Sequence, residues 1–580
     1  MDMPVTQITS DDLIPIENHF RVSAGPGAGK THWLVNHIKN VLYKSKRLRK
    51  TRRIACITYT NVAVETILGR LGATSDRVEV STIHSFLYKH IIRPYVSFIA
   101  GEYRLNVQKM DGHDDHIVSF SKVSEWIRAD YKALAYLFND NGLTAYHLEN
   151  LRWILEGNDL KLKISKRKGS YDVKIGRNVQ QLHFIGDDKQ DKLLAYKKLY
   201  WNDGILHHDD VLFFSYKLIQ KFPFILKVLR AKFPYFFVDE FQDTNPIQTA
   251  ILKQIGQEET VIGIIGDKAQ SIYGFQGAEP EHFGSFALSN IEDYQMADNR
   301  RSINQNVDLL NCIRIDVIQN KFRNEDGENP RIIVGDMNTA LQRCQVICGD
   351  EKVYSLSRLN ITSNAMKRDL DGVQFNGKLI EELTEKDPAS KSNKYRSKVI
   401  IGCIKATELA QEKRFKEAIR ELEKIFRDIA DKNERRKTAL KYINLLLQKR
   451  IEFESESLYE FHSFVKGEIK TDISNLQAGA ARTFYDSHTY RQLALCVNIK
   501  DDGSLHRTIH KSKGDEFDNV LLVLTKETDL EFLFNPDLNN EKHRLYYVAV
   551  SRAKNRLFIN LPSLSVDNRT KLQGLNFVIE

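Results

Sequence analysis

The residues best suited to chemistry in this sequence lie in one glycine-rich run, Ala24-Gly25-Pro26-Gly27-Ala28-Gly29-Lys30-Thr31. Glycines let successive backbone N–H groups turn toward one point, so such a run can surround a chain of phosphates. Lys30 would reach the β- and γ-phosphates, and the Thr31 hydroxyl would bind Mg²⁺. A short strand-like run (19–23) precedes the loop and an amphipathic helical pattern follows it, which is the setting that a phosphate loop needs. We therefore predict a site for a nucleoside triphosphate here in preference to an ordinary glycine-rich turn.

Two acidic residues far downstream could complete this site. Residues 235–238 form a short apolar run, which predicts a buried parallel strand, and Asp239 and Glu240 follow it directly. Asp239 at the carboxyl end of a strand can hold Mg²⁺ through water, and Glu240 can orient and deprotonate an attacking water. Together with the loop, the acidic pair predicts a nucleoside triphosphatase (NTPase).

Further motifs follow in order along the chain. They are Thr58-Tyr-Thr-Asn61, Ser81-Thr-Ile-His84, Phe241-Gln-Asp-Thr-Asn245, the run 266–278, Asn299-Arg300-Arg301-Ser302, the run 508–517 and the run 544–553. In this order they resemble the UvrD/Rep/PcrA group of superfamily 1 DNA helicases. The motifs span residues 24 to 553, so the resemblance covers almost the whole chain.

The resemblance implies ATP and Mg²⁺ as cofactors and gives further residues a role at the nucleotide. Gln270 would sense the γ-phosphate, and Arg301 and Arg552 would contact it from a second motor lobe. Glu516 and Arg300 would help to hold the nucleotide. Such arginines are typically worth about 10³–10⁵ in rate.

The resemblance also implies a path for single-stranded DNA, with the residues Thr58, Tyr59, Asn61, His84 and Phe275. Flat side chains can stack on any base, at roughly 1–3 kcal/mol each, which suits movement that ignores sequence. Core packing is the alternative interpretation for Tyr59 and Phe275.

Three positions depart from the family pattern. Arg300 stands where the family carries an aromatic residue that stacks on adenine, although a guanidinium can also stack on a base. The upstream LNxxQ signature that reads adenine is missing, and Gln7 lies at a comparable distance from Lys30 in a different context. Gln276 replaces the usual arginine beside the DNA-stacking aromatic, which predicts weaker coupling to DNA.

Alternating strand-like and helical patterns predict an α/β fold with two RecA-like parallel-sheet motor domains. Expected strands are 54–58, 235–238 and 261–265 in the first domain and 353–356, 520–524 and 557–560 in the second. The first motor domain would use residues 1–95 and 206–295, with an insertion at 96–205. The second would use 296–365 and 495–580, with a reduced, helical insertion at 366–494. Residues 407–450 within it predict a helical hairpin broken at 431–433.

Composition fits these expectations. The 580 residues carry a net charge of +9, which suits contact with a phosphate backbone without proving it. Basic runs at 44–53 and 161–168 could be nucleic-acid contacts or solvated faces. The six cysteines have no zinc-type spacing, and no apolar run approaches the ~20 residues of a membrane span. We expect a cytoplasmic protein without a membrane partner.

Single-stranded and tailed duplex DNA are the expected partners, and a 3′→5′ helicase and translocase is the predicted function. The chain shows no nuclease signature, so we expect a motor without its own cutting chemistry. The alternative is a DNA-responsive ATPase that gates a partner nuclease, since compact UvrD-like proteins of antiphage systems such as Gabija look similar in size. A repair protein is another candidate partner.

Overall fold

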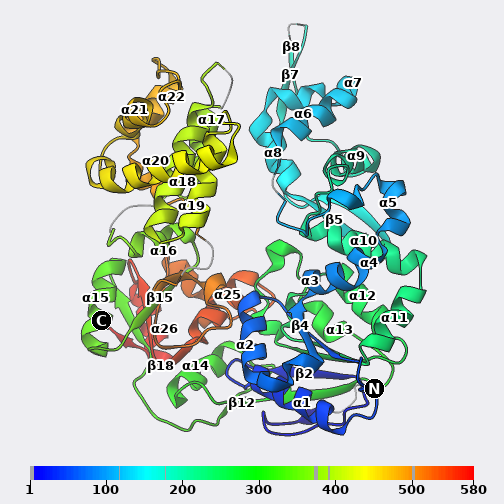
Figure 1. The fold of residues 1–580 in the computed structure, drawn as a ribbon. Coiled ribbons are helices and arrows are strands. Elements are labelled where there is room, and N and C mark those ends of the chain that lie inside the picture. The colour runs from blue at the N-terminus through cyan, green and yellow to red at the C-terminus, as the bar shows by residue number, and fades with distance from the viewer. Residues whose placement is uncertain (1–4, 117, 177, 371–375, 389–391, 500–502) are drawn as a thin grey trace. The chain divides into compact units, whose positions relative to one another are not determined.

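The computed structural model describes residues 5–116, 118–176, 178–370, 376–388, 392–499 and 503–580, without the side chains of Ile175 and Gln276. The chain divides into two compact units, which Figure 1 shows coloured along the sequence. The first unit holds residues 1–327 and 531–551, and the second holds 328–530 and 552–580.

The first unit is built on a seven-stranded parallel sheet, in the order β1-β11-β2-β10-β9-β3-β4. Its strands are β1 (Thr6–Gln7), β2 (Phe20–Ala24), β3 (Ile54–Thr58), β4 (Val78–Thr82), β9 (Tyr235–Val238), β10 (Val261–Gly266) and β11 (Glu292–Met296). Every residue of β3, β9 and β10 is buried, as expected of central parallel strands that are covered on both faces. The three strands predicted for this domain are confirmed.

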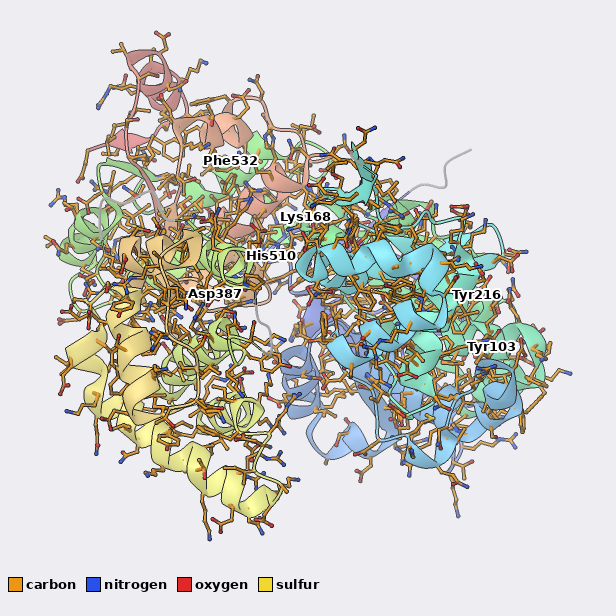
Figure 2. The ribbon with its side chains drawn as sticks, turned by 90° about the horizontal axis from the view of Figure 1, so that it is seen from above. Tyr103, Lys168, Tyr216, Asp387, His510 and Phe532 are labelled. Carbon is orange, nitrogen blue, oxygen red and sulfur yellow. The ribbon has the colours of Figure 1, made fainter. Side chains whose placement is uncertain are left out.

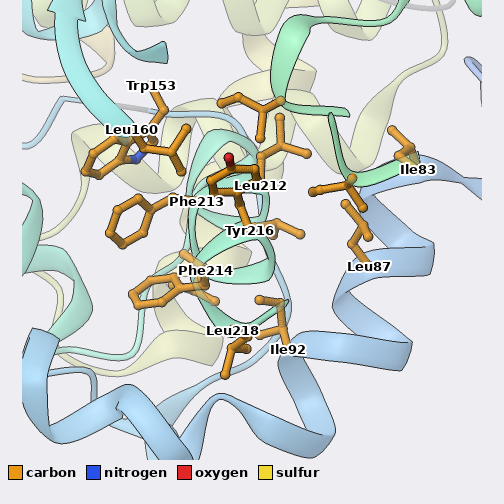
Figure 3. Packing of buried hydrophobic residues seen from close by; sticks show 14 of the residues in the cluster. Ile83, Leu87, Ile92, Trp153, Leu160, Leu212, Phe213, Phe214, Tyr216 and Leu218 are labelled. Atoms are coloured by element: carbon orange, nitrogen blue, oxygen red, sulfur yellow. The ribbon is translucent and has the colours of Figure 1, made fainter. Parts of the chain in front are cut away.

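Alternate residues of β9 enter different cores, because successive side chains of a strand point to opposite faces. Tyr235 and Phe237 pack on one face with helix α1 (Lys30–Lys44). Phe236 and Val238 belong to a larger core on the other face. This larger core surrounds α10 (His208–Lys221), whose residues 210–216 are all buried. Figure 3 shows Phe213 of α10 beside Trp153, and their ring centroids are 3.9 Å apart.

The segment 96–205 mixes helices with two antiparallel hairpins. The main helices are α5 (Ser97–Tyr103), α6 (Phe120–Ala129), α8 (Asn141–Glu149) and α9 (Gln190–Trp201), and the hairpins are β5–β6 (Leu151–Glu156, Asp159–Ile164) and β7–β8 (Tyr171–Ile175, Asn178–Leu182). Strand β6 contains the start of the second basic run. Lys161 and Lys163 both pair there with Glu156, so this part of the run is a charged, solvated strand face.

The second unit contains a six-stranded parallel sheet in the order β16-β15-β17-β18-β14-β19. Its strands are β14 (Arg331–Val334), β15 (Val353–Ser357), β16 (His506–Thr508), β17 (Phe517–Val523), β18 (Ala553–Leu561) and β19 (Val578–Ile579). The predicted strands lie within or overlap β15, β17 and β18. Two large parallel sheets confirm the predicted α/β class.

The segment 366–494 is helical where it is described. Its helices are α17 (Leu379–Lys386), α18 (Arg396–Gln411), α19 (Phe415–Ile425), α20 (Lys432–Phe453), α21 (Leu458–Glu468), α22 (Ala480–Ser487) and α23 (Tyr490–Ala494). Asp387, labelled in Figure 2, is buried and accepts hydrogen bonds from Arg396 (2.7 and 2.9 Å) and Tyr485 (3.0 Å). This network ties α18 to α22.

The predicted helical hairpin in this segment was wrong in one respect. A break at 412–414 separates α18 from α19, in addition to the predicted break before α20. Lys413 has φ +60°, and Arg414 donates its backbone N–H to the Leu409 carbonyl at 2.9 Å. A left-handed residue of this kind ends a helix, so three helices replace the expected two.

Within the described ranges, no helix is both long enough and apolar enough to cross a membrane.

Candidate nucleotide and DNA site

The predicted functional residues of the first unit follow neighbouring parallel strands at their carboxyl ends. The phosphate loop follows β2, Gln270 follows β10, the acidic pair follows β9, and the segments 58–61 and 82–84 follow β3 and β4. In an open parallel sheet, ligands bind at this edge. The fold therefore gathers residues that lie more than 200 positions apart in the sequence.

The phosphate loop needs glycine at two positions with left-handed backbone. Gly27 has φ +74° and Gly29 has φ +80°. A Cβ on Gly27 would lie 2.9 Å from the Cβ of Arg301 and 2.6 Å from Asn299 Oδ1, and one on Gly29 would lie 2.9 Å from Ser10. The loop leads directly into α1, whose first turn contains no acidic residue, so the positive end of the helix dipole is available to an anion.

Lys30 is held close to the loop that it follows. Its Nζ atom donates to the backbone carbonyls of Ala24 (3.2 Å) and Gly25 (3.4 Å). Ala24 and Ala28 are buried, which fixes the loop between strand and helix. This arrangement presents a cation at the loop, as binding of phosphate oxygens requires.

The acidic pair follows β9, and its second residue has a strained backbone. Asp239 is buried and donates its backbone N–H to the Ile57 carbonyl at 2.8 Å. Glu240 has φ +54°, a region that costs a non-glycine residue of order 1–3 kcal/mol and is concentrated at functional sites. Its carboxylate accepts a hydrogen bond from the Gln242 side chain. The oxygen donors Thr31 and Asp239 suit Mg²⁺, which prefers hard oxygen ligands.

A buried network that sequence analysis missed positions Gln270. The Gln270 amide donates to Asp267 at 2.5 Å, and Asp267 pairs with Arg314 at 2.7 Å. Gln242 Oε1 accepts the Asp267 backbone N–H at 2.9 Å, so Gln242 connects Glu240 with the Gln270 loop. Gln242 and Asp267 lie inside the motif runs, but only their burial reveals this role.

Residues 297–327 group with the first unit. Arg300 donates its backbone N–H to the Gly27 carbonyl at 3.0 Å, and the Gln319 side chain donates to the Pro26 carbonyl at 2.7 Å. The Arg301 guanidinium donates to the Ser551 carbonyl at 2.8 Å. Arg300 and Arg301 thus lie beside the phosphate loop.

Arg552 and Glu516 belong to the second unit, where each directly precedes one of two adjacent strands, β18 and β17. Phe517 pairs with Ala553 across β17 and β18, and Arg552 donates to the Asp515 carbonyl at 3.2 Å. Arg552 is buried, while Glu516 pairs with Lys554 at 3.4 Å. Their reach toward the nucleotide stays a prediction.

The predicted DNA residues include two aromatics that share a cluster with a third. The Tyr59 ring stacks on Tyr273, with centroids 4.6 Å apart and planes at 25°, and Tyr273 lies 6.0 Å from Phe275. Phe275 is 49% exposed, which leaves its ring accessible to a base. Sequence analysis missed Tyr273. Thr58 is buried at the end of β3, and Asn61 is exposed at the start of α2 (Asn61–Leu71).

His84 lies in a group of three partly exposed histidines. Its ring centroid is 5.4 Å from that of His208 and 6.3 Å from that of His113. Burial, together with these two neighbours, lowers the pKa of His84 to about 3. His84 is therefore neutral near pH 7 and can contact DNA as a neutral hydrogen-bonding ring.

Comparison with known proteins identifies the chain. The model of the UvrD/REP helicase N-terminal domain matches residues 6–289, and the model of the UvrD-like helicase C-terminal domain matches residues 345–563. The chain belongs to the UvrD-like helicase family. The resemblance seen in the motifs is thereby confirmed.

Individual relatives of this UvrD-like helicase are distant. The Gabija protein GajB of Bacillus cereus is 27% identical over 51% of this chain and 47% of its own length. The ATP-dependent DNA helicase PcrA of Bacillus subtilis is 27% identical over 45% of this chain and 32% of its own. DNA helicase II of Escherichia coli is 24% identical over 50% and 38%, respectively. The chain thus matches less than half the length of these relatives.

The structure gives contacts for two of the three residues that depart from the family pattern. The Gln7 side chain lies on the edge strand β1 and donates a hydrogen bond to the Gln295 side chain at 2.5 Å. Its amide group is therefore already used at the edge of the sheet. Arg300 pairs with Asp11 at 2.7 Å, and its guanidinium carbon lies 3.9 Å from the centroid of Phe322. The side chain of Gln276 lies outside the described part of the structure, so the prediction about it stays open.

Proposed function

We propose that this UvrD-like helicase is an ATP-dependent motor that moves 3′→5′ along single-stranded DNA and unwinds duplex DNA. The observation that carries the proposal is that the residues expected to bind nucleotide and those expected to bind DNA lie at one edge of a single sheet. The phosphate loop, the Asp239–Glu240 pair and the Tyr59 cluster all follow strands of one parallel sheet. The direction of movement rests on the family resemblance.

The nucleotide chemistry would depend on four residues of the first unit. Lys30 and the loop amides would bind the β- and γ-phosphates. Glu240 would orient the attacking water and accept its proton. Thr31 and Asp239 would hold Mg²⁺, which neutralises charge on the phosphates when bound.

The signal for hydrolysis would pass through the buried network around Gln270. Asp267 and Arg314 hold the Gln270 amide, and Gln242 contacts both Glu240 and the Asp267 backbone. A shift of the γ-phosphate contact at Gln270 would therefore reach the general base through directly bonded neighbours. Arg301 and, from the second unit, Arg552 and Glu516 would complete the charge balance around the nucleotide.

The DNA path would use the aromatic cluster as a stacking surface. Phe275 has an exposed ring, while Tyr59 and Tyr273 already stack on one another. Bases that insert here would gain roughly 1–3 kcal/mol each without reading sequence. Binding should fall steeply with salt, because the backbone phosphates release counterions.

An ATPase assay with and without single-stranded DNA tests this proposal. We expect stimulation by DNA, no turnover in Lys30→Ala, and retained ATP binding without turnover in Glu240→Gln, whose amide cannot accept the proton. A matched control is Glu258→Gln, an exposed acid outside the site. Turnover above a few per cent of wild type in Glu240→Gln would show that another group is the base.

A second candidate function is an ATPase subunit that gates a partner nuclease. The similarity to the Gabija protein GajB favours it. An adjacent nuclease gene whose product co-purifies with this chain and cuts DNA only when its ATPase is intact would support gating. A displacement assay on tailed duplexes separates the two functions. Opening a base-pair step costs about 1.4 kcal/mol, and a reduced insertion at 366–494 would offer less surface for holding the duplex ahead of the motor. We expect poor unwinding of long duplexes by the isolated chain, and processive unwinding would favour an autonomous helicase.

A further inference from the structure

The basic run 44–53 has no role in the proposed motor, and its contacts differ from those of the second basic run. Seven of these ten residues are Lys or Arg, and none is acidic. The cations of β6 are paired with Glu156, whereas the cations of 44–53 divide into two groups. One group bonds to neighbouring parts of the first unit, and the other is exposed to solvent.

The arginines of the first group hold the segment in place. Arg47 donates to the Glu17 carboxylate at 3.3 Å and to the Glu259 carbonyl. Its guanidinium carbon also lies 5.2 Å from the ring centroid of Tyr235, the first residue of β9. Arg52 in turn donates to the Arg47 carbonyl at 3.3 Å. These contacts fix the segment at the amino end of the sheet, so its exposed cations are positioned before a ligand binds.

Four cations of the second group lie on this fixed support. They are Lys44, Lys46, Arg49 and Lys50, which are all exposed and form no ion pair within the described ranges. Tyr43, in the last turn of α1, is 90% exposed beside them. Four uncompensated positive charges on one short segment attract a polyanion, and tyrosine hydroxyls are among the donors that bind phosphate oxygens.

The segment lies at the opposite edge of the sheet from the residues expected to bind nucleotide and single-stranded DNA. Helix α1 begins directly after the phosphate loop and ends at Lys44, and its 15 residues span about 22 Å. Strand β3 then runs back from Ile54 to Thr58, the residue before Tyr59. A ligand of the segment 44–53 therefore occupies a second site, separate from the Tyr59 cluster.

We propose that the segment 44–53 binds the phosphate backbone of duplex DNA outside the path of the translocating strand. An acidic protein is a poorer match, because protein interfaces have apolar cores and are depleted in lysine. Apart from Thr51, the exposed residues of this segment are all Lys or Arg. Duplex DNA carries one negative charge per about 1.7 Å of its axis, and cations bind it through release of counterions. The contact holds DNA without selecting a sequence, since phosphates are the same at every base pair.

Fluorescence anisotropy with a labelled blunt duplex of about 20 base pairs tests the inference, because this probe offers the motor path no single strand. The test variant is Lys46→Ala/Arg49→Ala/Lys50→Ala, which removes three exposed cations and keeps the arginines that hold the segment. The slope of the logarithm of the association constant against the logarithm of salt concentration should become less negative by about 2–3. At about 0.1 M salt the affinity for the duplex should fall at least about tenfold.

The matched control is Lys109→Ala/Arg128→Ala/Lys132→Ala, which removes the same charges from exposed positions of the segment 96–205. It should keep the wild-type slope and affinity. Equal losses in the two triple variants would assign the effect to net charge and overturn the inference. Unchanged duplex affinity in the test variant would leave the run to solvent or to an acidic protein, and would overturn it as well.

Two further measurements separate this site from the motor. ATPase stimulated by oligothymidine of about 10 nucleotides should stay at the wild-type level in the test variant, which also shows that the first unit is folded. Loss of that stimulation together with duplex binding would place the segment in the motor path and refute a second site. Lys30→Ala should bind the duplex like the wild type, so failure of the proposed ATPase and failure of this inference are distinguishable.

Discussion

His37 gives a test of the core beneath the phosphate loop. It lies on α1 at 1% exposure, and neither ring nitrogen has a hydrogen-bond partner. Its ring stacks on Trp33, with centroids 5.1 Å apart and planes at 7°, and contacts Phe20 and Phe237. We predict that replacing His37 by Leu removes a defined share of the acid sensitivity of the first unit.

The magnitude follows from the pKa of His37. Burial lowers it to about 3 from 6.5, because the charged ring cannot be solvated in the core. Between about pH 3 and pH 6.5, His37 binds a proton in the unfolded chain but stays neutral in the native protein. Stability is therefore lost as the pH falls below 6.5. Between pH 7 and pH 5 the loss from this group is about 2 kcal/mol, and any native pKa below 4 gives nearly the same figure.

Urea unfolding followed by tryptophan fluorescence measures this effect, since all four tryptophans lie in the first unit. The wild type should lose about 2 kcal/mol more than His37→Leu between pH 7 and pH 5. Substitution of the exposed His183 by Leu should leave the wild-type dependence unchanged. Equal losses in wild type and His37→Leu would show that His37 does not remain neutral in the folded protein.

Three further predictions concern the site. Gly27→Ala should weaken binding of a fluorescent ATP analogue at least about tenfold, because the left-handed backbone and the nearby Arg301 Cβ leave no room for a methyl group; unchanged affinity would contradict the described loop. Arg301→Ala and Arg552→Ala should each lower turnover at least ~10²-fold with a smaller effect on nucleotide affinity, and parallel loss of both quantities would count against their role in hydrolysis. Tyr59→Ala and Phe275→Ala should each cost roughly 1–3 kcal/mol of single-strand affinity while sparing basal ATPase, and a lowered melting temperature without that selective loss would assign the rings to the core.

Much of the site was predictable because its motifs are local. The apolar run before Asp239 and the glycines before Lys30 each mark a strand end within a few residues, and β9 and β2 lie where these patterns placed them. Gln242 and Arg314 could not be recognised in this way. A polar residue looks alike in sequence whether it is solvated or buried, and only their burial beside Glu240 and Asp267 reveals their contacts.

The sequence by itself therefore determined the α/β class, the family and the residues of the phosphate loop, since each depends on short-range spacing and strand periodicity. Only the tertiary structure decided the strand order that brings β2, β10 and β9 together, the stacking of Tyr59 on Tyr273 and the meeting of Asp11 with Arg300. The pairing of β2 with β10 and both side-chain contacts join residues that are more than 200 positions apart. Their formation depends on the free energy of packing the whole unit, which no local pattern encodes.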